Sequence, residues 1–267
     1  MPGDEPRPFS DANGEAVLRP CALLFLDILG VREMATGSEA GKKLADLRTA
    51  LRRPLGDFLS PDSPWPAAFF SDTLVMVDPI SEKMRTHLTL VGLAVQASWI
   101  QVNLAAAGFF VRGALTLGKA HLEDALLFGP ALVEAYELER KAAVNPRILL
   151  SPIAVKAMKE GMAAEGQEEG GYFRVEQDGT VFIDYLDILI DDPSDPVPFL
   201  EIHRDMVRTQ LAATRRDARK WDKYRWVADY HDSYCRVELP AVPDLLIASD
   251  NRERHFERFK VDTSSDQ

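Results

Sequence analysis

Apolar residues fall in runs along this chain, and the first long run sets the frame for the rest. Residues 21–30 read Cys-Ala-Leu-Leu-Phe-Leu-Asp-Ile-Leu-Gly, with no charge before Asp27. Such a run predicts a buried strand, and the alternation of a strand places Phe25 and Asp27 on the same face. Gly30 permits a tight turn, and a helical pattern follows from Val31 to about residue 58.

The rest of the chain alternates between short apolar runs and helical patterns. Residues 67–77 form two apolar segments around Ser-Asp-Thr, which predicts a hairpin with Asp72 at its tip. Residues 81–108 carry aliphatic side chains at three- and four-residue steps, as in a core helix. Further predicted elements are strands over 109–118 and 147–151, a return strand that holds His121, two strands within 172–190, and helices over 131–143, 152–162, 199–219 and 221–237.

This order of elements predicts an α+β fold in which helices cover a mainly antiparallel sheet. The first elements follow the order β-α-β-β-α-β of the ferredoxin-like fold. A polar, proline-rich start predicts a flexible tail over residues 1–17, and residues 18–190 are expected to form one domain. The composition changes at residue 191, so 191–267 are expected to form a helical extension that frays after Pro243.

The overall charge narrows the classes of partner. The net charge is −11 and the sequence pI is about 5.0, which argues against nucleic acid or an anionic membrane surface. A small anionic substrate stays compatible, because bound metal ions reverse the local field. Two cysteines far apart make no disulfide framework, which indicates a reducing cytoplasm. No apolar run approaches the roughly 20 residues of a spanning helix.

Two isolated acids in apolar surroundings are the candidate chemistry. Asp27 ends a predicted strand beside a turn with free N–H groups, a suitable place for a metal ion and a phosphate. The same residue could instead cap the following helix. Asp72 is the second such acid, and it could equally be an ordinary turn residue.

Several stretches, which together cover roughly residues 20–185, resemble the class III nucleotidyl cyclases and predict their fold. They are Phe-Leu-Asp-Ile-Leu-Gly at 25–30, Phe-Ser-Asp-Thr at 70–73, Arg-Gly-Ala-Leu-Thr-Leu-Gly at 112–118, the stretch 128–139 from Phe-Gly-Pro-Ala, and Pro-Arg-Ile-Leu-Leu-Ser at 146–151. The Arg-Gly-Ala strand, His121, the Phe-Gly-Pro-Ala and Pro-Arg-Ile segments and the stretch 223–231 are similar to the Pycsar pyrimidine cyclases of bacterial anti-phage defence.

The resemblance implies conversion of a nucleoside triphosphate to a 3′,5′-cyclic monophosphate and pyrophosphate. Two divalent cations, Mn²⁺ or Mg²⁺, would sit between Asp27 and Asp72, with the backbone carbonyl of Ile28 as a further ligand. Phe25 would line the nucleotide pocket. Relatives are head-to-tail homodimers with shared, two-fold related active sites. The amides that would cradle the phosphates are those of Ile28, Leu29, Gly30 and Val31.

The chain departs from the purine cyclases at four positions. Ala68 and Pro130 stand where purine cyclases carry their base-reading pair, so adenine and guanine are not supported. Val133 and Glu137 stand where an asparagine and an arginine usually hold the ribose and the transition state. Another group must therefore stabilise the developing charge.

Three basic residues are candidates for that role, namely Arg140, Lys119 and Arg112. For each of them, a solvated or salt-bridged surface residue is the simpler interpretation. His121 is expected to be a structural hydrogen-bonding residue rather than an acid–base group.

Three functions are compatible with these residues. The first is a cyclase that converts UTP to cyclic UMP for anti-phage defence, with CTP to cyclic CMP as the close variant. The second is a degenerate dimeric domain that binds a nucleotide without turnover. The third is another palm-like nucleotidyl transferase, which the absence of a Gly-Gly-Asp/Glu-Glu-Phe signature makes less favoured.

Overall fold

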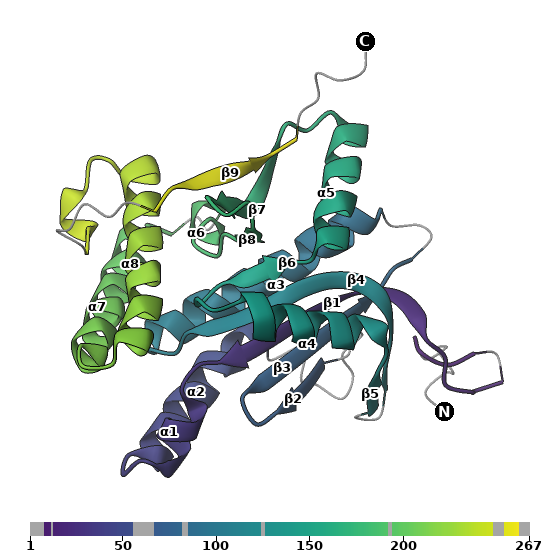
Figure 1. The fold of residues 1–267 in the computed structure, drawn as a ribbon, viewed down its shortest axis with the longest axis horizontal. Helices are drawn as coiled ribbons and strands as arrows, with labels where there is room; N and C mark the ends of the chain where they lie inside the picture. The colour runs from purple at the N-terminus through teal and green to yellow at the C-terminus, as the bar shows by residue number, and fades with distance from the viewer. Residues whose placement is uncertain are drawn as a thin grey trace.

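A single mixed sheet organises the computed structural model, which describes residues 8–11, 13–55, 67–81, 85–123, 126–191, 194–247 and 254–261. The strands lie in the order β2-β3-β1-β4-β6-β8-β7-β9, and β5 pairs with β4 (Figure 1). The strands are β1 (Arg19–Ile28), β2 (Ala67–Phe70), β3 (Thr73–Pro79), β4 (Val111–Glu123), β5 (Leu126–Phe128), β6 (Ile148–Leu150), β7 (Glu169–Glu176), β8 (Val181–Ile183) and β9 (Phe256–Lys260). The helices are α1 (Val31–Thr36), α2 (Ala40–Leu55), α3 (Thr86–Ala106), α4 (Pro130–Ala142), α5 (Pro152–Glu165), α6 (Ile188–Asp191), α7 (Val197–Thr214), α8 (Ala218–Glu238) and the short 3₁₀ helix Pro243–Leu245.

The first four strands form the ferredoxin-like core. Their spatial order, β2-β3-β1-β4, is antiparallel throughout, and it is the order that a β-α-β-β-α-β chain adopts. Among the described strands, β4 and β6 make the one parallel pair. The predicted α+β fold with a mainly antiparallel sheet covered by helices is therefore confirmed.

Strand β1 is buried on both faces, which explains its continuous apolar sequence. Leu24 and Leu26 belong to a core formed with α2, α3 and α5. Leu23 and Phe25 belong to a second core under α4, which lies across β1 and β4 in Figure 1. The predicted alternation is thus confirmed, and it places Asp27 on the α4 side of the sheet.

Among the described helices, α3 is the one that passes a length and composition test for a membrane-spanning segment. The helix has 21 residues, and an 18-residue stretch within it passes by length and composition with a mean hydropathy of 1.4. Polar residues such as Gln101 and Asn103 interrupt the segment, so no continuous apolar run appears in the sequence. In the fold, 61% of this stretch is buried inside the protein, packed against α2, α5 and α7. Burial in the core accounts for its composition.

The segment before β1 is packed rather than loose over the part that the structure describes, which corrects the expectation of a flexible tail. Phe9 is fully buried, and its ring meets His121 edge-on with 5.6 Å between centroids. The N–H of Val17 donates to the carbonyl of Phe9 at 2.9 Å, and Nδ1 of His121 lies 3.2 Å from the carbonyl of Val17. His121 therefore has the structural role that we expected, while residues 1–7 lie outside the described part.

The C-terminal extension is joined to the sheet and is not purely helical. Strand β9 pairs with β7 at the edge of the sheet, which corrects the expectation that the chain frays after Pro243. Trp226 and Tyr230 of α8 are fully buried and pack against Phe182 of β8. Burial of these aromatic rings holds α7, α8 and β9 on the end of the sheet (Figure 1).

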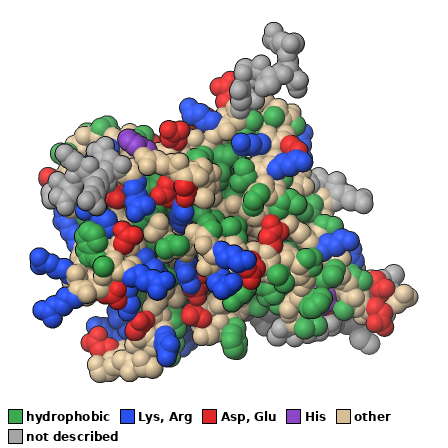
Figure 2. Space-filling model, in the orientation of Figure 1, with side chains coloured by type: hydrophobic (Ala, Val, Ile, Leu, Met, Phe, Trp, Pro, Cys, Tyr) green, Lys and Arg blue, Asp and Glu red, His purple; other side chains and the backbone are tan. Residues whose placement is uncertain are grey.

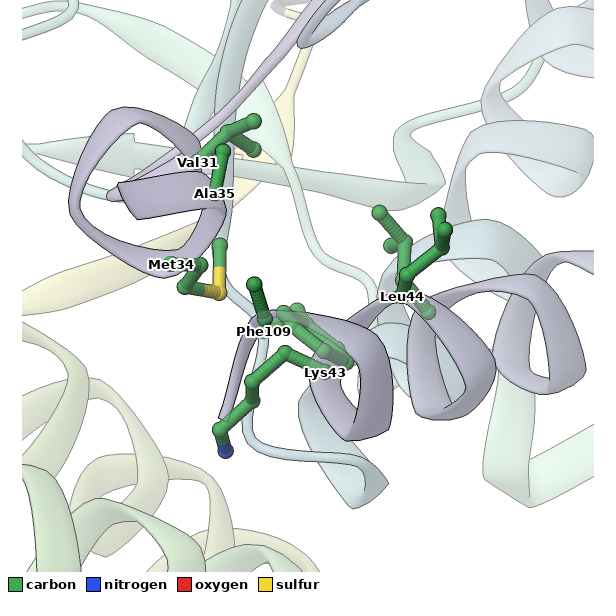
Figure 3. A pocket seen from close by; sticks show the side chains of 8 residues that line it. Val31, Met34, Ala35, Lys43, Leu44 and Phe109 are labelled. Atoms are coloured by element: carbon green, nitrogen blue, oxygen red, sulfur yellow. The ribbon is translucent and has the colours of Figure 1, made fainter. Parts of the chain in front are cut away.

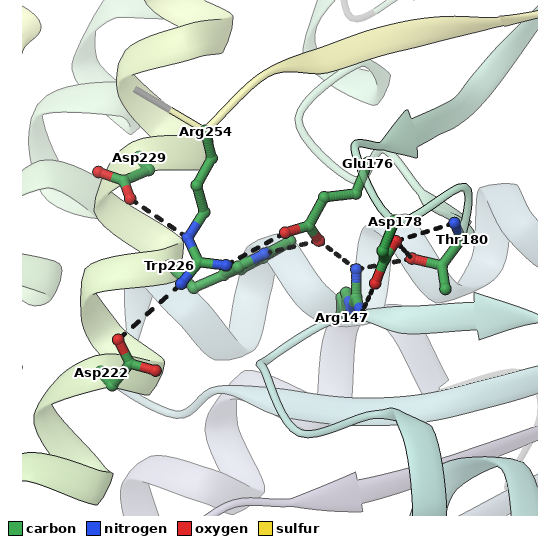
Figure 4. A network of polar contacts seen from close by, with 8 residues as sticks. All are labelled: Arg147, Glu176, Asp178, Thr180, Asp222, Trp226, Asp229 and Arg254. Atoms are coloured by element: carbon green, nitrogen blue, oxygen red, sulfur yellow. Dashed lines mark hydrogen bonds and ion pairs between the residues drawn. The ribbon is translucent and has the colours of Figure 1, made fainter. Parts of the chain in front are cut away.

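A polar network ties this extension to the core. Arg147, before β6, forms a buried ion pair with Glu176 of β7. Glu176 also accepts hydrogen bonds from Trp226 at 3.0 Å and from Arg254 at 3.2 Å. Arg254 reaches Asp229 of α8 at 3.5 Å, so the network joins β7, α8 and the segment before β9 (Figure 4).

Candidate active site

The structure brings Asp27 and Asp72 to the same end of neighbouring strands. Asp27 is opposite Thr73 in the register of β1 and β3, and Asp72 directly precedes Thr73. The N–H of Ile28 donates to the backbone carbonyl of Asp72 at 2.8 Å. The negative charge of Asp72 is one of the causes that raise the pKa of Asp27. The two acids are therefore electrostatic neighbours although they are 45 positions apart in the sequence.

Asp72 is held by a tight hairpin turn. Phe70 pairs with Thr73, which leaves a two-residue turn. Ser71, the first residue of that turn, has a φ of 57°, in the left-handed region that glycine usually occupies there. A non-glycine residue in this region is a strained conformation of the kind found at functional sites.

Asp27 makes an ion pair with Arg112 and does not cap a helix. Arg112 is directly opposite Asp27 in β4, and its Nε donates to Oδ2 of Asp27 at 2.9 Å. The N-cap position of α1 is Gly30, without a side-chain cap. Burial raises the pKa of Asp27, whereas the hydrogen bond and charge of Arg112 lower it. The capping interpretation of Asp27 is thus excluded.

Glu139 of α4 is a third acid at the site that the sequence analysis missed. Its carboxylate Oε1 lies 2.7 Å from Nε of Arg112, yet this buried oxygen has no hydrogen-bond partner among the described residues. Burial raises the pKa of Glu139. The signal was present in the sequence, because Glu139 follows Ala131 and Ala135 at four-residue steps on the buried face of the helix, where a charge is uncommon.

Lys223 of α8 contributes a second cation. It is half-buried, and burial lowers its pKa, as do the positive charges of Arg112 and Arg219. Asp27 and Glu139 oppose that shift. Lys223 belongs to the stretch 223–231 of the family resemblance, and nothing in that stretch indicated a role for it. Because Lys223 lies in α8, the C-terminal extension reaches the site.

The turn after β1 offers fewer free amides than expected. The N–H of Ile28 is bound to Asp72, and the N–H of Leu29 donates to the carbonyl of Phe110 at 2.8 Å. Ile28 and Leu29 therefore cannot hold a phosphate without breaking sheet contacts. Gly30, with a φ of 81°, and Val31 keep their predicted role, and the Ile28 carbonyl stays a predicted metal ligand.

The other predicted site residues are placed differently. Phe25 is 7% exposed and packs edge-on against Tyr136 of α4. Arg140 is exposed and lies 3.7 Å from Glu137 on the same helix. Lys119 is exposed and lies seven residues along β4 from Arg112, a span of roughly 23 Å. Of the three candidate cations, Arg112 is the one that contacts Asp27 within this chain.

The residues at this end of the sheet fit a divalent cation of the Mg²⁺ or Mn²⁺ type. Two carboxylates offer the hard oxygen ligands that such ions prefer, and the buried Oε1 of Glu139 lacks a donor. Within the described ranges, no group of three or more His, Cys, Asp or Glu residues is placed to hold a metal ion. A cation held by Asp27 and Asp72 would therefore need further ligands from backbone, substrate or water.

A small apolar pocket lies behind the turn. It is lined by residues of α1 and α2 and by Phe109, with Nζ of Lys43 5.8 Å from the centre of the Phe109 ring (Figure 3). Its volume of about 80 Å³ is far below the several hundred Å³ of typical ligand sites. Neither Asp27 nor Asp72 lines it, so we assign no ligand to it.

Comparisons with known proteins find similar solved structures but no matching family. No protein-family model matches the chain, and no curated protein matches it significantly. Among solved structures, it is similar to the adenylyl cyclase CyaB from P. aeruginosa, with 14% identity, 62% of this chain and 94% of that chain covered, and a TM-score of 0.48. It is also similar to the guanylyl cyclase Cya2, with 11% identity, 62% and 91% coverage, and a TM-score of 0.42.

A third similar structure is a class III adenylyl cyclase-like ATP-binding protein from Pseudomonas aeruginosa. It shares 16% identity over 79% of this chain and 43% of that chain, with a TM-score of 0.42. Identities and scores this low carry no conclusion about what the present chain binds or does.

Proposed function

We propose that this chain is a nucleotidyl cyclase that converts UTP to 3′,5′-cyclic UMP and pyrophosphate. One observation carries the proposal: two acids, Asp27 and Asp72, lie at the same end of adjacent strands in a ferredoxin-like sheet, where the charge of Asp72 contributes to the raised pKa of Asp27. They stand in the segments that resemble the metal-binding segments of class III cyclases. The conversion of CTP to cyclic CMP is the close variant.

The groups of the chain divide the chemistry between them. Asp27 and Asp72 would hold two divalent cations, Mn²⁺ or Mg²⁺, which, when bound, promote ionisation of the ribose 3′-hydroxyl and neutralise the triphosphate. The amides of Gly30 and Val31 would orient the phosphates. Arg112 is placed to balance negative charge as the 3′-oxygen attacks the α-phosphorus in line and pyrophosphate leaves.

The choice of a pyrimidine base is supported by what the base-reading positions lack. Ala68 in β2 and Pro130 at the start of α4 carry no side-chain donor or acceptor. A purine therefore finds no polar partner at these positions, so the contacts by which the purine cyclases are expected to favour adenine or guanine are missing.

A second copy of the chain is the proposed partner. Large apolar side chains are exposed around α4 and the neighbouring strand ends, where Figure 2 shows hydrophobic patches between charged ones. Phe70 is 83% exposed, Phe128 64% and Val133 61%. Exposure of several large apolar side chains on this part of the surface indicates an interface. A head-to-tail homodimer with shared sites would let Arg140 or Lys119 of the second copy contribute to the site. A cytoplasmic role in anti-phage defence follows from the resemblance alone.

One observation favours the degenerate nucleotide-binding alternative. Arg112 forms an ion pair with Asp27, so a positively charged side chain already neutralises one of the two acids proposed to bind metal. A domain of that kind would bind a nucleotide without turning it over.

Turnover assays separate these functions. Purified protein with Mn²⁺ is incubated with each of the four nucleoside triphosphates, and pyrophosphate and cyclic product are measured. Release of pyrophosphate and cyclic product from UTP or CTP alone supports the proposal, whereas tight binding of a nucleotide without turnover supports the degenerate domain. Linear or dinucleotide products would identify a different nucleotidyl transferase.

Substitution of the two acids tests the assignment directly. Asp27→Asn and Asp72→Asn should each lower turnover at least about a hundredfold, because an amide is a poor ligand for a divalent cation. Asp46→Asn on α2 is the matched control and should keep full activity. Near wild-type turnover in either site variant, with unchanged unfolding temperature, would show that the metal assignment is wrong.

A further inference from the structure

The guanidinium of Arg112 carries more donors than it uses. Its Nε donates to Asp27 at 2.9 Å and also lies 2.7 Å from Oε1 of Glu139. Its two terminal nitrogens make no hydrogen bond with the described residues. The side chain is 27% exposed, so these unused N–H groups lie within reach of a ligand.

Glu139 is in the complementary position. Its side chain is 5% exposed, and its Oε1 is a buried acceptor without a hydrogen bond. A buried acceptor left without a donor is costly, and the single N–H on Nε of Arg112 is directed at Asp27 and makes no hydrogen bond with Glu139 although the two atoms are close. The geometry therefore contains two competing acceptors for one proton donor.

We propose that Arg112 exchanges partners when metal and substrate bind. Before binding, Nε of Arg112 donates to Asp27 and serves as its counter-ion. After binding, the N–H on Nε turns to Glu139, Asp27 is released to the cation, and the two terminal nitrogens bind a phosphate oxygen of the substrate. Arg112 would then be a substrate-contacting residue and Glu139 its positioning residue, and this inference rests on the proposed function.

Charge and geometry both favour the exchange. A divalent cation at Asp27 repels the guanidinium, whereas Glu139, held in the buried face of α4, keeps its attraction. The planar fork of an arginine suits two parallel hydrogen bonds to a phosphate. Glu139 would thus convert a displaced counter-ion into an oriented phosphate ligand.

Binding of inorganic pyrophosphate tests the exchange without any turnover. Pyrophosphate is titrated by calorimetry into protein loaded with Mn²⁺, for the wild type, Glu139→Gln and Glu134→Gln. Glu134 is the matched control, because it is an exposed acid on the same helix. We expect Glu139→Gln to weaken pyrophosphate binding about tenfold, through the loss of an oriented charge-assisted contact, and Glu134→Gln to change it less than twofold.

The expected sign separates positioning from general electrostatics. Removing a negative charge beside an anion site should tighten anion binding if Glu139 acts through its charge alone. Unchanged or tighter pyrophosphate binding by Glu139→Gln would therefore overturn the proposal.

A double-mutant cycle keeps the test valid even if Glu139→Gln is less stable. If Glu139 acts through Arg112, Glu139→Gln should change pyrophosphate binding less than twofold in an Arg112→Gln background. An equal loss in both backgrounds would assign Glu139 a separate structural role and overturn the exchange. Failure of the proposed function would look different, since wild-type protein would then bind pyrophosphate in this pattern and yet cyclise no nucleoside triphosphate.

Discussion

Asp78 in β3 is a buried acid with no assigned role at the site. Asp78 is 8% exposed, and no described residue pairs with its carboxylate. Burial raises its pKa from 3.8 to about 6. The folded protein therefore holds a proton on Asp78 more tightly than the unfolded chain does, and stability falls as the pH rises from about 4 to about 6.

Asp78→Asn should remove this dependence. Below pH 4 the acid is protonated in both states and the substitution should be nearly neutral. Above pH 6 it should stabilise the protein by up to about 3 kcal/mol, because the ionised acid is no longer buried. Urea unfolding of Asp78→Asn, wild type and the control Asp46→Asn at pH 4 and pH 7.5 measures the difference. Equal gains at both pH values would contradict the assignment.

At the level of residues, the sequence identified the acids but not their neighbours. Asp27 and Asp72 stood out because each was a lone charge in an apolar run, which a single sequence displays directly. The contacts of Arg112 with Asp27 and Glu139 join residues from three elements, and only the folded register brings them together. Arg140 and Lys119 were equally plausible before the fold fixed their positions.

At the level of the element, the close pairing of β1 with β4 depends on Gly113. A Cβ on Gly113 would lie 2.1 Å from the backbone carbonyl oxygen of Phe25 and 3.1 Å from Cδ2 of Leu26. Gly113→Ala should therefore force β4 away from β1 and destabilise the protein by about 3 kcal/mol or more. The same shift should weaken Mn²⁺ binding, because Arg112 and Asp27 flank the distorted pair.

A second glycine provides the matched control. Gly92 lies within α3, and a Cβ there meets nothing within 4 Å. Gly92→Ala should stabilise the protein by up to about 1 kcal/mol through helix propensity. Thermal unfolding of both variants compares the two signs, and equal effects would refute the packing explanation.

At the level of elements, local patterns predicted most of the core. The hairpin around Asp72 and helix α4 were expected because their apolar spacing and turn residues are local signals. Strand β9 was missed, because its sequence, Phe-Glu-Arg-Phe-Lys at 256–260, is largely charged. Its pairing with β7 stabilises it as a strand, and its own sequence has no apolar pattern that predicts one. The long helix expected from Val31 divides into α1 and α2 at Gly37, which ends α1 in an extended conformation.

The proposed homodimer makes a prediction at the level of the whole molecule. Val133 on α4 is 61% exposed and Val237 on α8 is 60% exposed. Val133→Asp should weaken self-association at least about tenfold, because it places a charge in an apolar interface. Val237→Asp is the matched control and should leave association unchanged.

Sedimentation velocity at several protein concentrations measures both variants. Turnover of Val133→Asp should fall in parallel with its association, since each site is expected to need both chains. A variant that stays dimeric, or a monomeric variant with full activity, would contradict shared active sites.

The same register that builds the candidate site also governs how the chain reaches its native state. Arg112 and Asp27 are separated by 85 residues, and Arg254 of the second half meets Glu176 across 78. Such distant pairings close large loops before any contact compensates for the lost entropy, so folding should be slow for a protein of this size. Until β4 arrives, the apolar strand β1 is an unpaired edge, and newly made chains should be prone to aggregation and helped by chaperones or low temperature.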